Sequence, residues 1–305
     1  LGNFNVSAKG DDRMSESRHN PDQLLKEIQA DEENRNKGHL KIFFGYAAGV
    51  GKTYAMLEAA HMEKQQGIDV VAGYVETHAR PKTAALLNGL EVLPTREVFY
   101  NGMILDEFDI GMALKRKPQL ILVDELAHTN AEGCRHAKRY QDIKELLNAG
   151  IDVYTTVNVQ HIESLCDTVA SITEIVVRER IPDSIFDNAD QVELIDIEPQ
   201  DLINRLNTGN VYRQTQEKQA VENFFTIENL TALREISLRR CADRVNILTE
   251  NTRIKNHGDY HTGEHILVCL SSSPSNAKII RTAAKMASAF KGEFTALFLE
   301  TPGFS

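Results

Sequence analysis

Short apolar segments alternate with helix-like segments through the middle of the chain, and this alternation restricts the fold more than any other feature. The apolar segments have the length of β-strands and few polar residues, as strands buried on both faces do. They are Leu40–Phe44, Asp69–Val75, Leu120–Val123, Ile151–Val157 and Glu174–Val177. Since such strands alternating with helices form parallel sheets with helices on both faces, the sequence predicts an α/β fold.

The helix-like segments between these strands include Thr53–Gln66 and Arg135–Ala149, and Gly150 is expected to end the second of them. A weaker apolar run, Val192–Ile197, is expected to add an edge strand before Pro199. These segments predict that helices cover the sheet and that the sheet ends near residue 197.

A helical extension is predicted after the sheet. The segments Asp201–Leu206, Gln214–Phe225 and Leu230–Ile254 have few strand signals between them, and the last carries apolar residues at the spacing of an amphipathic helix. Composition then marks residues 256–264 as a linker.

The two ends of the chain are expected to lie outside this main domain of residues 38–255. Residues 1–37 are interpreted as a tag, with the look of vector sequence, followed by a polar lead-in. Residues 265–305 contain one strand–helix–strand unit: His265–Leu270, Asn276–Phe290 and Glu293–Leu299. A lone unit cannot bury both faces of a parallel sheet, so we expect this second α/β domain to continue beyond residue 305.

Charge and hydropathy exclude some classes of partner. The formal net charge of −10 argues against non-specific binding to nucleic acid or to anionic lipid, because basic surfaces drive both. No stretch approaches the ~20 apolar residues needed to span a bilayer, so any membrane part of the parent protein is expected outside this chain. The four cysteines are far apart and form no CxxC pair, which is typical of thiols in a reducing compartment.

The segment GYAAGVGKT, residues 45–53, lies between a predicted strand and a predicted helix, where a phosphate-binding loop (P-loop) belongs. Small residues let successive backbone N–H groups surround phosphates, and the helix N-terminus adds the positive end of its dipole. Lys52 is expected to contact the β and γ phosphates of ATP or ADP, and the Thr53 hydroxyl to bind Mg²⁺. The loop residues expected at the nucleotide are Gly45, Gly49, Val50, Gly51, Lys52 and Thr53.

One position departs from the common spacing G-x4-G-K-[ST]. The first glycine would fall at position 46, where this chain has Tyr46, and glycine stands one residue earlier. The start of the loop is therefore expected to differ from the usual turn. The alternative interpretation is a glycine-rich turn with a solvated lysine.

Two carboxylates follow the apolar run Leu120–Val123, as in a Walker B strand. Asp124 is expected to hold Mg²⁺ through water beside Thr53, and Glu125 to orient or deprotonate an attacking water. A buried strand that ends in acidic residues is commonplace by itself. Following a P-loop, with strands between them, the pair indicates a nucleotide site.

Polar residues also follow two other predicted strands, whose carboxyl ends should meet at the same edge of the sheet. Asn158 and Gln160 are candidates for sensing the γ-phosphate, and Glu76, His78 and Arg80 for contacting a substrate or a partner. Ordinary loop polarity is the alternative for each of them. Further candidates after the Walker B strand are His128, Asn130, Arg135 and His136.

Taken together, these segments resemble the KdpD family of osmosensitive, potassium-related sensor histidine kinases. The resemblance rests on FFGYAAGVGKTYAML, GYVETHARPKTAALLNGLE, LILVDELAHTN, RHAKRYQDIKELLNAGIDVYTTVNVQHIESL and NLTALREISLRRCADRV. It implies an ATP site at Gly51, Lys52, Thr53, Asp124 and Glu125. It also implies that the unit after residue 264 begins a universal-stress-protein-like domain.

The same resemblance implies the cytoplasmic N-terminal module of an inner-membrane sensor kinase. Its partners would be the rest of that kinase and a response regulator that controls potassium uptake, and the kinase core would lie beyond residue 305. Three functions stay open: a regulatory nucleotide-binding module, an ATPase or small-molecule kinase in its own right, and an interaction scaffold with a vestigial P-loop. Glu125 favours turnover, whereas the sequence identifies no arginine placed to assist phosphoryl transfer, so at most slow hydrolysis is expected.

Overall fold

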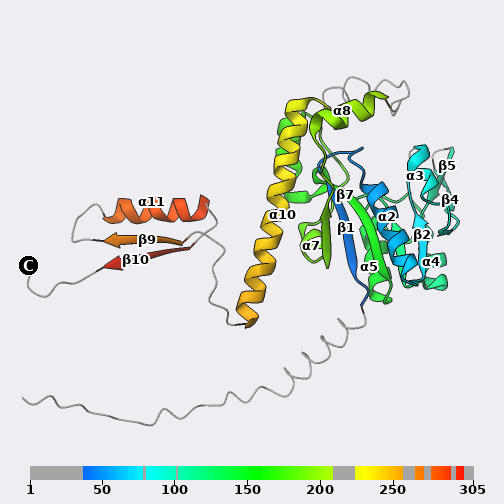
Figure 1. Cartoon of the computed structure of the whole chain (residues 1–305), viewed down its shortest axis with the longest axis horizontal. Coiled ribbons are helices and arrows are strands. Elements are labelled where there is room, and N and C mark those ends of the chain that lie inside the picture. Colours follow the sequence, from blue (N-terminus) through cyan, green and yellow to red (C-terminus); the bar gives the residue numbers. More distant parts are fainter. Residues whose placement is uncertain are drawn as a thin grey trace, which may run out of the picture. The chain divides into compact units, whose positions relative to one another are not determined.

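The computed structural model describes residues 37–77, 80–100, 102–208, 224–256, 265–270, 276–289 and 293–298. The chain divides into two compact units, Leu1–Leu238 and Arg239–Ser305 (Figure 1). No helix among the described residues is long and apolar enough to cross a membrane.

A six-stranded parallel sheet forms the centre of the first unit. Its order is β3-β2-β6-β7-β1-β8, and each pair of neighbours is parallel. The strands are β1 (Leu40–Gly45), β2 (Val70–Tyr74), β3 (Glu91–Val92), β6 (Leu120–Val123), β7 (Asp152–Asn158) and β8 (Gln191–Leu194). The α/β fold predicted from the sequence is therefore confirmed.

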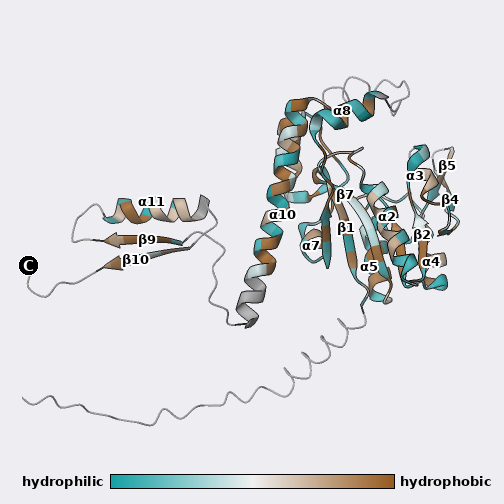
Figure 2. Cartoon of the chain, viewed as in Figure 1, coloured by the Kyte–Doolittle hydropathy of each residue, from teal (hydrophilic) through white to brown (hydrophobic). Residues whose placement is uncertain are grey.

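Helices cover this sheet. They are α2 (Lys52–Gln65), α3 (Pro81–Ala85), α4 (Ile110–Arg116), α5 (Arg139–Asn148), α6 (Cys166–Thr173), α7 (Asp183–Asp187), α8 (Pro199–Thr208) and the start of α10 (Ile227–Asn256). The short 3₁₀ helices η1 (Val159–His161) and η2 (Glu163–Leu165) follow β7. Phe43, Leu122 and the α2 residues Met56 and Leu57 are buried in one core, and Figure 2 shows hydrophobic residues along β1.

Five predicted strands have counterparts in the sheet, including the edge strand, which is β8 beside β1. The predicted strand Glu174–Val177 is wrong. Glu174 has a φ of 59°, in the left-handed region, and ends α6, while Val176 is 71% exposed. The run is apolar enough for a strand, but β8 already occupies the edge beside β1.

The predicted helix Arg135–Ala149 begins later than expected, at Arg139, because the residues before it form a turn closed by a bridge between Thr129 and Lys138. The expected helix Gln214–Phe225 lies mostly outside the described residues, as do the lead-in 1–37 and the linker 256–264. An antiparallel hairpin of β4 (Arg96–Tyr100) and β5 (Met103–Glu107) precedes α4 and was not predicted.

The second unit contains the predicted strand–helix–strand segment. β9 (His265–Leu270) and β10 (Glu293–Phe298) pair in parallel, and α11 (Asn276–Ala289) connects them. Val268, Ala283 and Ala287 are buried. The βαβ arrangement is thus confirmed.

Candidate functional site

The turn between β1 and α2 contains three glycines, and two structural features require glycine there: lack of space for a Cβ atom and positive φ angles. A Cβ atom at Gly45 would lie 2.7 Å from Val50 Cγ2 and 3.2 Å from Lys52 Cδ, so the strand end leaves no room for a side chain. Gly49 and Gly51 have φ values of 92° and 112°, which side chains strongly disfavour. No side chain caps the start of α2, so its first N–H groups remain available to solvent or a ligand.

Tyr46 explains the departure from the common motif spacing. Its ring is fully buried and its hydroxyl donates to the carbonyl of Ile197 at 3.0 Å. Burial and the nearby Asp196 carboxylate raise the pKa of Tyr46 to about 12. The side chain therefore anchors the turn to the segment after β8 instead of entering the cavity described below.

Lys52 lies at the first position of α2 and is buried. Its Nζ donates to the carbonyl of Ala47 at 3.0 Å, inside the turn. Burial lowers the pKa of Lys52 to about 8, against the opposing effect of Asp124, and the nearby Arg80 lowers it further. A cation held this way, with a carbonyl as its hydrogen-bond partner, is stabilised by an arriving anion.

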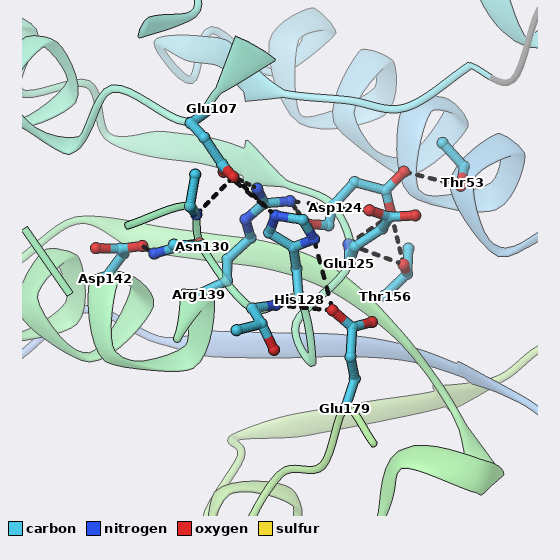
Figure 3. Close-up of polar contacts among 12 residues, drawn as sticks. Thr53, Glu107, Asp124, Glu125, His128, Asn130, Arg139, Asp142, Thr156 and Glu179 are labelled. Atoms are coloured by element: carbon cyan, nitrogen blue, oxygen red, sulfur yellow. Dashed lines mark hydrogen bonds and ion pairs between the residues drawn. The ribbon is translucent and has the colours of Figure 1, made fainter. Parts of the chain in front are cut away.

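Asp124 stands at the end of β6 and is 1% exposed. Its Oδ2 accepts a hydrogen bond from Thr53 Oγ1 at 3.0 Å, and its Oδ1 accepts from the hydroxyl of Thr156 and from the backbone N–H of Glu125 at 3.0 Å. The first turn of α2 and the ends of β6 and β7 therefore meet at one carboxylate (Figure 3).

Glu125 has a left-handed backbone with a φ of 58°, which costs a residue with a side chain about 1–2 kcal/mol. Its carboxylate lies 3.9 Å from Nη1 of Arg139, which is fully buried. Arg139 also donates to the carbonyl of Asp124 at 3.3 Å and to Glu107 Oε2 at 3.1 Å, and its guanidinium lies 4.1 Å from the centre of the Tyr74 ring. Arg139 thus holds the Asp124–Glu125 turn from behind.

Glu107, at the end of β5, links Arg139 to His128. It is 3% exposed, and its pKa is lowered despite its burial because His128 and the backbone N–H of Ala131 donate to it, at 3.2 and 2.8 Å. Glu179 lies on the other side of His128, with 3.8 Å between its carboxylate and His128 Nδ1. Figure 3 shows this chain of polar contacts from Thr53 to Glu179.

His161 extends this chain of polar contacts beyond Glu179. Its Nδ1 donates to the carbonyl of Glu179 at 2.9 Å, and burial lowers the pKa of its ring. The neutral ring therefore leaves Nε2 as an acceptor.

A cavity of about 140 Å³, called the loop cavity below, is lined by Lys52, Thr53, Asp124, Glu125, His128, Thr156, His161 and Glu179, among others. Of the residues predicted from the sequence, it brings together Gly49, Gly51, Lys52, Thr53, Arg80, Asp124, Glu125, Asn158 and the further candidate His128. The side-chain oxygen of Asn158 is buried, lacks a partner among the described residues, and belongs to a residue of the cavity wall.

Other predicted residues lie elsewhere. Gly45, Val50, Glu76 and Gln160 do not line the loop cavity, and His78 lies outside the described residues. Val50 is 1% exposed and contributes packing, while Gly45 contributes space for Lys52. Asn130 and Arg135 line a second cavity of about 180 Å³, and His136 pairs with Glu145 at 2.8 Å.

Sequence reasoning missed Thr83, Glu107, Arg139, Thr156, His161 and Glu179 as individual site residues. Glu107 and Glu179 lie far in the sequence from the residues that donate hydrogen bonds to their carboxylates, by 21 to 50 positions. Thr156 lies in the predicted strand Ile151–Val157 and His161 directly follows Gln160, so the polar end of that strand is the signal that could have found them.

Comparison with known proteins identifies similarity to one family, KdpD. The sequence profile of KdpD, described as the osmosensitive K⁺ channel His kinase sensor domain, matches residues 36–245. The chain is 57% identical over 287 residues to a sensor protein KdpD of Clostridium acetobutylicum and 51% identical over 290 residues to that of Escherichia coli (strain K12). Each alignment covers 93% of this chain but 32% of the relative, so the chain spans about a third of their length.

A shorter KdpD relative, from Synechocystis sp., is 47% identical over 263 residues, which cover 86% of this chain and 70% of that protein. The profile match spans more than half of this chain, and the identities extend beyond it on the C-terminal side. The chain therefore belongs to the KdpD family of sensor kinases and contains the sensor domain of that family.

Proposed function

We propose that the loop cavity binds ATP or ADP together with Mg²⁺. The observation that carries this proposal is the meeting of buried Lys52 with the Thr53–Asp124 pair in one cavity, beside two glycines of positive φ. Lys52 supplies a buried cation, and the glycines allow backbone N–H groups to approach phosphate oxygens. A triphosphate or diphosphate ester is the ligand class that uses all of these groups.

The donor set fits magnesium. Thr53 Oγ1 and Asp124 Oδ2 are hard oxygen donors 3.0 Å apart, and Mg²⁺ in nucleotide sites is held by one or two such side chains, phosphate oxygens and water. Bound there, the ion would neutralise charge on the phosphates. Thr156 and the N–H of Glu125 orient the Asp124 carboxylate from the opposite side.

Glu125 is the candidate for orienting an attacking water. Its carboxylate is more than one-third exposed at 38% and lines the loop cavity, so it can reach a water molecule there. Arg139 lies 3.9 Å from this carboxylate and attracts it electrostatically. We propose that this chain hydrolyses ATP slowly at most.

Calorimetric titration of this chain with ATP and ADP, with and without Mg²⁺, tests the proposal, and its pH dependence tests the role of Lys52. Below about pH 8 the lysine is already charged in the free protein, so the affinity should be constant. Above it, binding must take up a proton, because phosphates raise the pKa of the bound lysine. Between pH 7 and pH 9 the affinity for MgATP should fall roughly tenfold.

Two results would contradict these expectations in different ways. Absence of heat and of competition with a fluorescent nucleotide at pH 7 would refute nucleotide binding. Binding with the same affinity at pH 7 and pH 9 would leave nucleotide binding intact and refute the electrostatic role of Lys52.

We further propose that this module regulates the output of a two-component sensor kinase through its nucleotide state. The relatives named above are sensor proteins, which supports a response regulator as the downstream partner, a membrane-bound parent protein and a role in potassium uptake. On this proposal the module lies on the cytoplasmic side, where ATP is available, and the second unit begins a universal-stress-protein-like domain.

The contacts behind the loop support a route for this regulation within the first unit. A Cβ at Gly49 would lie 3.1 Å from Leu202 of α8, so α8 packs directly against the turn. Tyr46 is hydrogen-bonded to Ile197, and both neighbours of Ile197 form ion pairs with Arg234 of α10, at 2.7 Å each. A conformational change in the turn would therefore be transmitted to α8 and α10 through these contacts.

Hydrogen exchange measures whether this route is used. With a non-hydrolysable ATP analogue, exchange in residues 195–202 and 227–238 should be slower than with ADP, because a ligand shifts an equilibrium only through contacts that differ between states. Residues 97–100 of β4, which contact neither this route nor the polar residues around the loop cavity, are the internal control. Protection that stays confined to residues 45–53 would argue against regulation by this route.

A further inference from the structure

Arg80 lines the loop cavity together with Gly49 and Gly51 of the glycine turn. It precedes α3, and its backbone is fixed by two hydrogen bonds: its N–H donates to the carbonyl of Thr77 at 2.9 Å, and its own carbonyl accepts from Ala84 at 2.9 Å. Pro81 at the first position of α3 restricts the backbone further. The side chain therefore starts from a defined place on the cavity wall.

The guanidinium of Arg80 has no hydrogen bond or ion pair with any residue that the structure describes. The three carboxylates around the same cavity have other partners: Thr53 and Thr156 for Asp124, Arg139 at 3.9 Å for Glu125, and the backbone N–H of Thr129 at 2.9 Å for Glu179. Arg80 and Lys52 are close enough for the charge of one to disfavour the charge of the other. An anion between these two cations would relieve that repulsion.

The order of the strands shows which part of an anion Arg80 can reach. The glycine turn follows β1, Asp124 follows β6 and Arg80 follows β2, and in the sheet β7 and β6 lie between β1 and β2. With neighbouring strands about 4.8 Å apart, the ends of β1 and β2 are ~14 Å apart along the edge of the sheet. Phosphates that begin at the turn and run past Thr53 and Asp124 would approach Arg80 only with their far end.

We infer that Arg80 contacts the terminal phosphate of a bound nucleoside triphosphate, so that this chain binds triphosphates more tightly than diphosphates. The inference rests on the proposed nucleotide site and adds the residue that distinguishes the two ligands. A diphosphate bound at the same turn ends near Asp124 and leaves Arg80 without an anionic partner. Arg80 thereby becomes the specificity-determining cation of the loop cavity.

The variant Arg80→Gln tests whether Arg80 contacts the terminal phosphate or only adds positive charge near the site. The variant should bind a non-hydrolysable ATP analogue with Mg²⁺ about 10- to 100-fold more weakly than the natural sequence, which is the usual loss for a charge-assisted hydrogen bond. Its affinity for MgADP should stay within about twofold, and Arg80→Lys should recover part of the loss. Lys82→Gln, two residues along at an exposed position of α3, removes the same charge outside the cavity and should change neither affinity.

The same titrations contain the results that would overturn the inference. If Arg80→Gln weakens both ligands equally, or if Lys82→Gln reproduces its effect, Arg80 does not read the terminal phosphate. Binding of neither ligand to the natural sequence would refute the proposed function itself, together with the inference. Circular dichroism of each variant verifies that the α/β fold is retained.

Discussion

Replacement of Lys52 by alanine is expected to weaken the binding of MgATP and MgADP at least ~100-fold while leaving the fold intact. The loss should be large because the lysine acts in a buried place, where a charge interacts with phosphate more strongly than in water. The fold should survive because Asp124 keeps its hydrogen bonds from Thr53 and Thr156. Isothermal titration measures the affinity, and urea unfolding should show a free energy of unfolding within about 1 kcal/mol of the natural sequence.

Lys64→Ala is the matched control for this prediction. Lys64 occupies the last turn of the same helix, is exposed, and donates to the carbonyl of Gly89 far from the loop cavity. It should bind both nucleotides as the natural sequence does. Unchanged affinity in folded Lys52→Ala would show that the nucleotide does not bind at Lys52 in the glycine turn.

The largest effect on stability is expected at Arg139. Arg139→Met should lower the free energy of unfolding by about 3–5 kcal/mol, because it leaves Glu107 buried without its guanidinium partner. Both side chains of this ion pair are almost fully buried, at 0% and 4% exposure. Urea unfolding at pH 7, where Glu107 with its lowered pKa is ionised, measures the difference.

Two further variants show whether burial causes this effect. Arg135→Met removes an ion pair with Glu145 in which the arginine side chain is 53% exposed, and it should cost at most about 1 kcal/mol. The double variant Arg139→Met, Glu107→Gln should regain part of the stability, since it removes the unpaired charge. If Arg139→Met is no less stable than Arg135→Met, the Glu107–Arg139 pair does not support the Asp124–Glu125 turn as described.

The inner strands of the central sheet could be predicted because they are largely apolar on both faces, whereas the short edge strand β3 is exposed and was missed. Leu120–Val123 is buried at every position, and so short an apolar run between turn residues has few alternatives to a buried strand. The same criterion failed for Glu174–Val177, since apolar character says nothing about whether a place in the sheet is vacant. The β4–β5 hairpin was missed although Asn101–Gly102, a frequent two-residue hairpin turn, stands between two β-rich runs.

The part of the candidate site that lies at the ends of predicted strands and helices could also be predicted. Lys52, Thr53, Asp124 and Glu125 occupy ends of regular elements, so their motifs fix where their backbone lies. Glu107 and Arg139 are 32 residues apart, and Thr129 and Glu179 are 50 apart. Pairs of this kind depend on how loops fold over the sheet edge, which no local pattern in one sequence specifies.

Because α8 and α10 contact the segment behind the glycine turn, a fragment that retains an intact turn must include both helices. A fragment cut after the last strand of the sheet, β8, would contain every motif residue, from Gly45 to Asn158. It would nevertheless lose Ile197, Leu202 and Arg234, and with them the acceptor for Tyr46 and the cover over Gly49. The glycine turn and the helices after the sheet therefore form one structural block, and the KdpD profile likewise extends past β8 to residue 245.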